Sequence, residues 1–108
     1  MTRMWNLPPE ILCNQHLLGE HKELHQAVGS MNKGKSLKGH IEMGQIEIHN
    51  IKKRHDELVT EMIKRGFVHM SPLPKFKSFN AGYIDKDFNK RDLISRCNQC
   101  KKRFENGI

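Results

Sequence analysis

Three polar residues in the N-terminal part of the chain, His16, Glu20 and Glu23, follow one another at spacings of four and three. On an α-helix, side chains at these spacings lie on one stripe of the surface. This stripe faces roughly away from Leu17 and Leu24, which turn toward a core. Such a stripe can be a solvated helix face or can share a metal ion, although the zinc-protease order H-E-x-x-H is absent.

Cys97 and Cys100 form a lone CxxC pair in a helical pattern near the end of the sequence. A zinc ion needs about four ligands, so a site here would have to recruit Cys13 or the distant His69. Redox catalysis is a second option for a CxxC pair, but the βαβ pattern that usually carries it is missing. We therefore expect both cysteines to pack on the core side of a helix, with no bound metal and no cofactor.

Three helical patterns must position these residues. The first opens after Pro8-Pro9, a pair suited to the first turn of a helix, and runs to about residue 28. The second covers about residues 45–65 and ends in a stop signal, in which basic residues precede a glycine and an apolar residue. The third covers about residues 87–104.

Glycine, proline and lysine mark the connections between these patterns. Residues 32–39 form a flexible basic loop, and residues 71–77 form an extended segment rich in proline and lysine. No strand pattern and no internal repeat is evident. We predict an all-α fold: a compact single domain over residues 1–108, built of three main helices with long basic connecting loops.

The chain is small and basic. Its 108 residues support only a modest core, so we expect any chemistry to lie on the surface or in a shallow cleft. Lys and Arg number 19 against 12 acidic residues, and the net charge of +7 is the usual footprint of a nucleic-acid partner. No apolar run reaches the roughly 18 residues of a membrane-spanning helix, and a signal-peptide pattern is absent. We therefore expect a cytoplasmic protein that does not bind membranes.

The start of the chain carries a more specific pattern. Residues 1–3 read M-T-R, Gln15 and His16 form a Q-H pair, and residues 20–24 contain E-x-x-E-L. In these motifs and their distances from the N-terminus, the chain resembles the phage pyrimidine-dimer DNA glycosylases, the UV endonuclease family. The resemblance is strong over residues 1–28, fair to about residue 67 and faint beyond.

The resemblance implies a mechanism. Family members lose the initiating methionine and use the α-amine of the exposed threonine, here Thr2, as the nucleophile. An α-amine has a pKa of roughly 7.7–8.0, against ~10.4 for lysine, so neutral amine is present near pH 7 without a deep pocket. Its attack on the anomeric carbon of the sugar gives an imine. Glu23 matches the catalytic carboxylate, which would stabilise the positively charged intermediate and assist β-elimination at the abasic site.

Other positions match supporting residues of the family. By resemblance, His16 is a catalytic proton donor or phosphate contact, Arg3 contacts the DNA backbone and minor groove, and Gln15 is a positioning residue. Lys22 is a DNA-binding position that holds arginine in the best-known members, and lysine weakens forked phosphate recognition. The family's aromatic-rich C-terminal tail, which helps to grip the dimer lesion, is missing here.

The expected partner is damaged or abasic double-stranded DNA, with pyrimidine dimers as the lesion, bound by a monomer. Reaching the sugar within a duplex requires distortion of the DNA or extrusion of a nucleotide. Phosphate contacts are expected from the basic loop and the second helix, at Lys33, Lys35, Lys38, Lys52, Lys53 and Arg54. We expect Trp5 to pack over the core, with a role as a wedge near the opened site as the alternative.

Two other functions stay open at this point. One is a non-catalytic basic helical DNA-binding module, which accounts for the charge but not for the motif spacing. The other is a metal-dependent nuclease, which a chelator would inactivate.

A phage-encoded enzyme that acts inside the host cell also fits these expectations.

Overall fold

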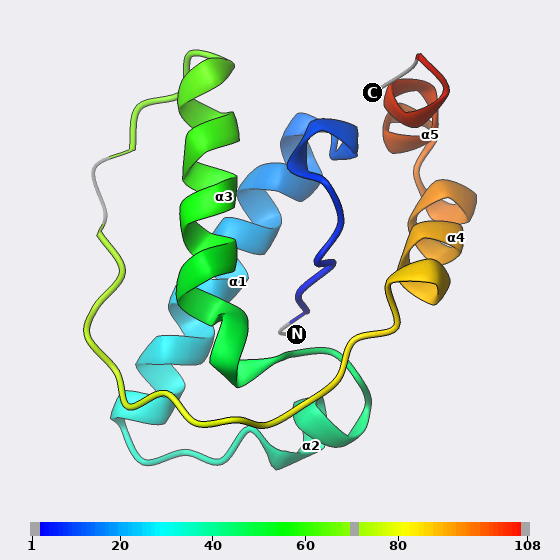
Figure 1. The fold of residues 1–108 in the computed structure, drawn as a ribbon. Helices are drawn as coiled ribbons and strands as arrows, with labels where there is room; N and C mark the ends of the chain where they lie inside the picture. Colours follow the sequence, from blue (N-terminus) through cyan, green and yellow to red (C-terminus); the bar gives the residue numbers. More distant parts are fainter. Residues whose placement is uncertain (1–2, 70–71, 107–108) are drawn as a thin grey trace.

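The computed structural model describes residues 3–69 and 72–106 (Figure 1). This part of the chain is helical and contains no strand, so the predicted all-α class is confirmed. The α-helices are α1 (Asn14–Asn32), α2 (Lys38–Glu42), α3 (Ile51–Lys64), α4 (Lys86–Arg96) and α5 (Asn98–Glu105), and the 3-10 turns are η1 (Pro9–Ile11) and η2 (Ile48–Asn50).

The helices form two groups with the N-terminal segment between them. α1 packs against α3, while α4 and α5 lie together on the other side of the molecule (Figure 1). Residues 3–12 run between these two groups, and η1 contacts both α3 and α5. The start of the chain is therefore an internal part of the fold.

A single apolar core joins the groups. Leu17 and Leu24 of α1, Leu58 of α3 and Leu93 of α4 are all fully buried in it. Trp5 is 7% exposed and belongs to the same core, which confirms that it packs there. Among the described residues, no helix combines the length and apolar character that crossing a membrane requires.

The first helix differs from its predicted limits at both ends. Residues 9–11 form η1, and Leu12 and Cys13 are extended, so α1 begins only at Asn14. At the other end, Gly29 does not stop the helix, which continues to Asn32. An internal glycine costs only about 1 kcal/mol relative to alanine, which is too little to end a helix packed along α3.

The other two predicted helices also need correction. α3 begins at Ile51 because η2 precedes it. The third predicted helix is interrupted at Cys97, whose extended backbone (φ −129°, ψ 108°) separates α4 from α5. With the short α2 after the basic loop, the described residues contain five α-helices and not three main ones. Helical periodicity cannot reveal a break of one residue, because the apolar pattern continues across it.

A buried ion pair connects α1 to α3. Arg54 donates from Nε and Nη2 to the two carboxylate oxygens of Glu20, at 2.6 and 3.0 Å. Arg54 also donates to the carbonyl oxygen of Leu7 in the N-terminal segment. The side chains of Arg54 and Glu20 are 2% and 0% exposed. The expectations that Glu20 faces away from the core and that Arg54 binds phosphate are therefore wrong, because periodicity cannot identify a buried charge that has a buried partner.

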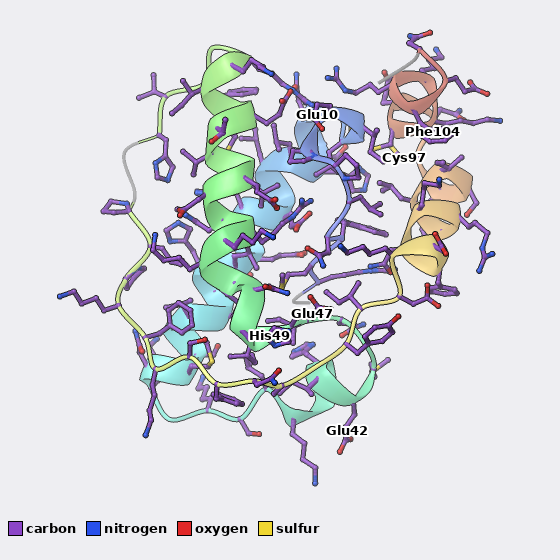
Figure 2. All side chains as sticks on the ribbon, viewed as in Figure 1. Glu10, Glu42, Glu47, His49, Cys97 and Phe104 are labelled. Carbon is purple, nitrogen blue, oxygen red and sulfur yellow. The ribbon has the colours of Figure 1, made fainter. Side chains whose placement is uncertain are left out.

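The segment that leads into α4 is held against the residues before η2. The buried Glu47 carboxylate accepts a hydrogen bond of 2.8 Å from the Ile84 N–H, and Figure 2 shows Glu47 between the start of α3 and this segment. Gly82 has a φ of +96°, and a Cβ at this position would lie 2.1 Å from the carbonyl oxygen of Ile46. Only glycine fits there. This close approach fixes the position from which α4 reaches the N-terminal segment.

Candidate active site

Glu23 lies in the middle of α1, half-buried beneath the N-terminal segment. Its Oε2 accepts a hydrogen bond of 3.0 Å from the backbone N–H of Arg3. Burial raises the pKa of the Glu23 carboxyl, and the Arg3 N–H opposes this effect by stabilising the charged form. The geometry brings together Arg3 and Glu23, two residues that the sequence analysis singled out.

The backbone of residues 3–5 is held from several sides. Besides the Arg3 bond to α1, the Met4 N–H donates to the Gln45 carbonyl oxygen at 2.7 Å. The Asn89 side chain of α4 donates to the Trp5 carbonyl oxygen at 3.0 Å. These bonds fix the direction in which the chain enters the fold, and Asn89 is a positioning residue that sequence reasoning missed.

The Arg3 side chain contacts both α4 and the Trp5 ring. Its Nη2 donates to Asn89 Oδ1 at 3.0 Å and to Asp92 Oδ2 at 2.8 Å, both on α4. The guanidinium carbon lies 3.9 Å from the centre of the Trp5 ring, in a cation–π contact. Arg3 therefore holds α4 against the N-terminal segment, and a contact to DNA would have to share this guanidinium.

Thr2, the predicted nucleophile, lies outside the described residues. Of the other predicted site residues on α1, Gln15 and Lys22 are exposed. His16 lies two helical turns before Glu23, about 10 Å along the helix axis. Its Nδ1 is 3.2 Å from the sulfur of Cys13, and its ring meets the edge of the Trp5 ring. The structure therefore does not bring His16 next to the Glu23 carboxylate.

A hollow of about 340 Å³ opens beside Arg3. Its rim includes three exposed apolar side chains, Met43, Tyr83 and Phe88, of which Tyr83 is 76% and Phe88 54% exposed. Aromatic faces exposed beside a basic residue suit the stacking of nucleic-acid bases. Sequence reasoning missed Tyr83 because it lies in an irregular segment without periodicity.

The predicted phosphate contacts other than Arg54 lie on the surface. The exposed lysines are Lys33, Lys35, Lys38, Lys52 and Lys53. Two of them have acidic neighbours one helical turn away, since Lys52 pairs with Asp56 at 3.0 Å and Lys38 with Glu42 at 3.8 Å. Exposed pairs of this kind contribute little to stability, so the lysines remain available to a stronger anionic partner.

Two groups of side chains could hold a metal. Cys97 and Cys100 pack against the core, as predicted, and they lie together with Cys13 and His16. His69 does not join them. It belongs to a second group on the other side of α1, with His21, His25 and His55. Burial, together with the neighbouring histidines, lowers the pKa of His21 to about 4.

The match to known families covers most of the chain. The family model for pyrimidine dimer DNA glycosylase matches residues 2–75. This region contains the N-terminal segment, Glu23 and the exposed lysines, whereas α4 and α5 follow it. Comparison with curated proteins and with solved structures gives no match.

Proposed function

The chain belongs to the pyrimidine dimer DNA glycosylase family, and we propose that it also cleaves the DNA strand as an abasic-site lyase, using the α-amine of Thr2 and the carboxylate of Glu23. Family membership, which the N-terminal motifs predicted, makes it a DNA glycosylase of DNA repair with DNA as its substrate. The lyase step, the residue roles, the monomeric state and the preference for pyrimidine dimers are parts of the proposal.

The observation that carries the proposal is the hydrogen bond from the Arg3 N–H to Glu23. Three covalent bonds separate the Arg3 nitrogen from the nitrogen of the preceding residue, so these nitrogens are at most about 4 Å apart in any conformation. Covalent geometry alone therefore keeps the amine of residue 2, once Met1 is removed, within about 7 Å of the Glu23 carboxylate oxygen. A half-buried carboxylate near an amine nucleophile suits imine chemistry on a sugar, because its charge stabilises the cationic intermediate.

The proposed reaction has four steps. The neutral amine attacks C1′ of the damaged nucleotide, and the bond from C1′ to the base breaks as the base leaves with a proton. The C1′–O4′ bond then breaks, O4′ takes a proton from water, and a protonated imine between the amine and C1′ remains. A base then removes a proton from C2′, and the C3′–O3′ bond breaks so that the phosphate leaves. Water finally hydrolyses the imine and regenerates the amine.

Glu23 acts at two of these steps. Its negative charge stabilises the cationic sugar and the protonated imine, which form within a few ångströms of it. It also accepts the C2′ proton, directly or through a water molecule. His16 is not included in this chemistry, because its Nδ1 faces the sulfur atoms of Cys13 and Cys100 at 3.2 and 3.6 Å.

DNA binding is assigned to two surfaces. The exposed lysines hold the phosphates, with Gln15 and Lys22 on the exposed side of α1. The hollow beside Arg3 receives the extruded nucleotide, which stacks on Tyr83 or Phe88.

Two labelled duplexes test the function, one with a single pyrimidine dimer and one with a single abasic site, without added divalent metal. The proposal expects strand cleavage of both, with an unsaturated sugar left at the 3′ end by β-elimination. Cleavage of neither duplex, despite binding, would leave a DNA-binding module as the better description. Cleavage that leaves a 3′-hydroxyl would indicate a metal-dependent nuclease.

A further inference from the structure

Four side chains that the proposed chemistry does not use converge at the junction of α1 and α5. They are Cys13, His16, Cys97 and Cys100, and their ligand atoms all lie within 4.8 Å of one another. We propose that these four residues bind one zinc ion, which staples the C-terminal helices to the start of α1. Three thiolates and one imidazole are a common donor set for structural zinc.

The distances fit a tetrahedral ion. With Zn–S bonds of about 2.3 Å and a Zn–N bond of about 2.0–2.1 Å, two sulfurs lie about 3.8 Å apart, and a sulfur and a nitrogen about 3.6 Å apart. The Cys13 and Cys97 sulfurs are 3.8 Å apart. His16 Nδ1 lies 3.2 Å from the Cys13 sulfur and 3.6 Å from the Cys100 sulfur. A disulfide would need a sulfur separation of about 2.05 Å, so this spacing suits a shared ion.

The local backbone supports the same reading. Cys13 and Cys97 are both extended residues that directly precede a helix, α1 and α5, and each has its partner ligand three residues later. The Cys13 N–H donates to the Cys100 sulfur at 3.2 Å, and the Cys100 N–H donates to the Cys97 sulfur at 3.4 Å. Such donors stabilise the negative charge of metal-bound thiolates. This geometry also explains why the third predicted helix is broken at Cys97 (Figure 2).

The proposed zinc site lies where it would hold α4 and α5 in place. α4 and α5 lie beyond the part of the chain that the family model matches. α4 nevertheless supplies Asn89 and Asp92, which hold the N-terminal segment through Arg3 and Trp5. An ion between α5 and the start of α1 would fix these helices where the segment needs them. Because four protein ligands fill the coordination sphere, the ion would be structural.

A different observation supports a second ion. His21 and His25 lie one turn apart on α1, opposite His55 of α3 and His69 of the following segment, with ligand atoms within 4.8 Å. The Nε2 atoms of His21 and His69 are buried and have no hydrogen-bond partner in the described part of the chain. Buried polar atoms without partners are rare in native proteins and point to a missing ion or water.

The geometry points to a divalent transition metal, such as zinc, held by the four imidazoles. Nitrogens bound to one tetrahedral zinc lie about 3.3 Å apart, and the Nε2 atoms of His25 and His55 are 3.2 Å apart. His55 Nδ1 lies 3.2 Å from a carboxylate oxygen of Asp56, as the second nitrogen of a metal-binding histidine usually does. Glu23 is two residues from both His21 and His25, about 200° around α1, so this ion would lie on the other side of the helix from the proposed chemistry.

Metal analysis of the purified full-length protein tests both sites. We expect about two equivalents of zinc in the wild type after dialysis against a zinc-containing buffer and then a metal-free buffer. Cys97→Ser keeps an oxygen that can cap α5 but removes one thiolate, and it should lose about one equivalent. His69→Asn lies outside the helices and should lose the other equivalent. His49→Asn is the matched control, since His49 is exposed and belongs to neither group.

Cobalt(II) distinguishes the ligands in the wild-type protein. Binding at the cysteine site should give an intense thiolate-to-cobalt charge-transfer absorption, and this band should disappear in Cys97→Ser and persist in His69→Asn. Failure of Cys97→Ser to lose metal, or the absence of the band in the wild type, would overturn the cysteine site. Full metal content in folded His69→Asn would overturn the histidine site. If either variant does not fold, the number of cobalt ions bound by the wild type decides. Two bound ions support both sites, one bound ion overturns one of them, and no bound ion overturns both.

Discussion

The backbone N–H of Arg3 donates a hydrogen bond of 3.0 Å to the side chain of Glu23, twenty residues away in the sequence. This bond ties the first described residue to the middle of α1. In the next two residues, the Met4 N–H donates a hydrogen bond to the Gln45 carbonyl oxygen, and the Trp5 carbonyl oxygen accepts one from the Asn89 side chain. Residues 3–5 are thus held by hydrogen bonds from α1, from the residues before η2 and from α4.

Replacing Glu23 by glutamine should separate chemistry from binding. The amide oxygen can still accept the Arg3 N–H, so the fold should persist, but the charge and the proton acceptor are lost. We expect strand cleavage at an abasic site to fall by about 100-fold or more, with little change in the Kd for the same duplex. Glu42→Gln, an exposed carboxylate of α2, is the control and should cleave normally. Equal cleavage by both variants would remove Glu23 from the mechanism.

The lysines of the basic loop should control the dependence of DNA binding on salt. Each phosphate contact adds about 0.9 to the slope of log K against log salt concentration. Replacing Lys33, Lys35 and Lys38 together by serine should therefore lower the slope by about 2.7. The comparison variant replaces Lys64, Lys101 and Lys102, which are equally exposed but lie on other surfaces. Equal slopes for the two triple variants would place the DNA elsewhere.

The aromatic rim of the hollow should matter for lesion recognition but not for imine formation. We expect Tyr83→Ala or Phe88→Ala to reduce cleavage of dimer-containing DNA about tenfold, because each stacked base is worth about 1–3 kcal/mol. Cleavage at a preformed abasic site, which has no base to stack, should change much less. Phe79→Ala is the control, since Phe79 is 51% exposed and lies outside this hollow. A parallel loss on both substrates would indicate a structural role for the rim.

The buried pair of Glu20 and Arg54 should dominate the effect of charge on stability. Glu20→Gln leaves a buried guanidinium without its counter-charge, and we expect the free energy of unfolding to fall by about 3–5 kcal/mol. The exposed pair of Lys38 and Glu42 provides the comparison, and Glu42→Gln should cost less than about 1 kcal/mol. Urea unfolding followed by circular dichroism measures both. Similar losses would mean that the Glu20 pair is more solvated than its burial indicates.

Much of the fold could be predicted from the sequence, because it depends on local patterns. Apolar residues at helical spacing predicted the all-α class, and the resemblance of the N-terminal motifs predicted the family. The predicted ends of the helices were less accurate where a single residue decides them. At Cys97, for example, an extended backbone separates two helices that share one apolar pattern.

The parts of the site that could not be predicted depend on residues distant in the sequence. Arg3 and Asp92 form an ion pair across 89 positions, and no periodicity connects them. The same is true of Cys13 and Cys97, which meet only when α5 folds against the start of α1. A carboxylate such as Glu20 reads as a surface residue until its buried partner Arg54 is known.

The proposed imine between the amine of Thr2 and the sugar can be trapped with borohydride. The protein is mixed with a duplex that holds one abasic site, sodium borohydride is added, and the adducted peptide is identified by mass spectrometry. We expect a covalent protein–DNA complex joined at the α-amine of Thr2, and we expect this complex to be lost when one residue is added before Thr2 or when Met1 is retained. A complex joined at a lysine, or no complex from protein that binds the same duplex, would contradict it.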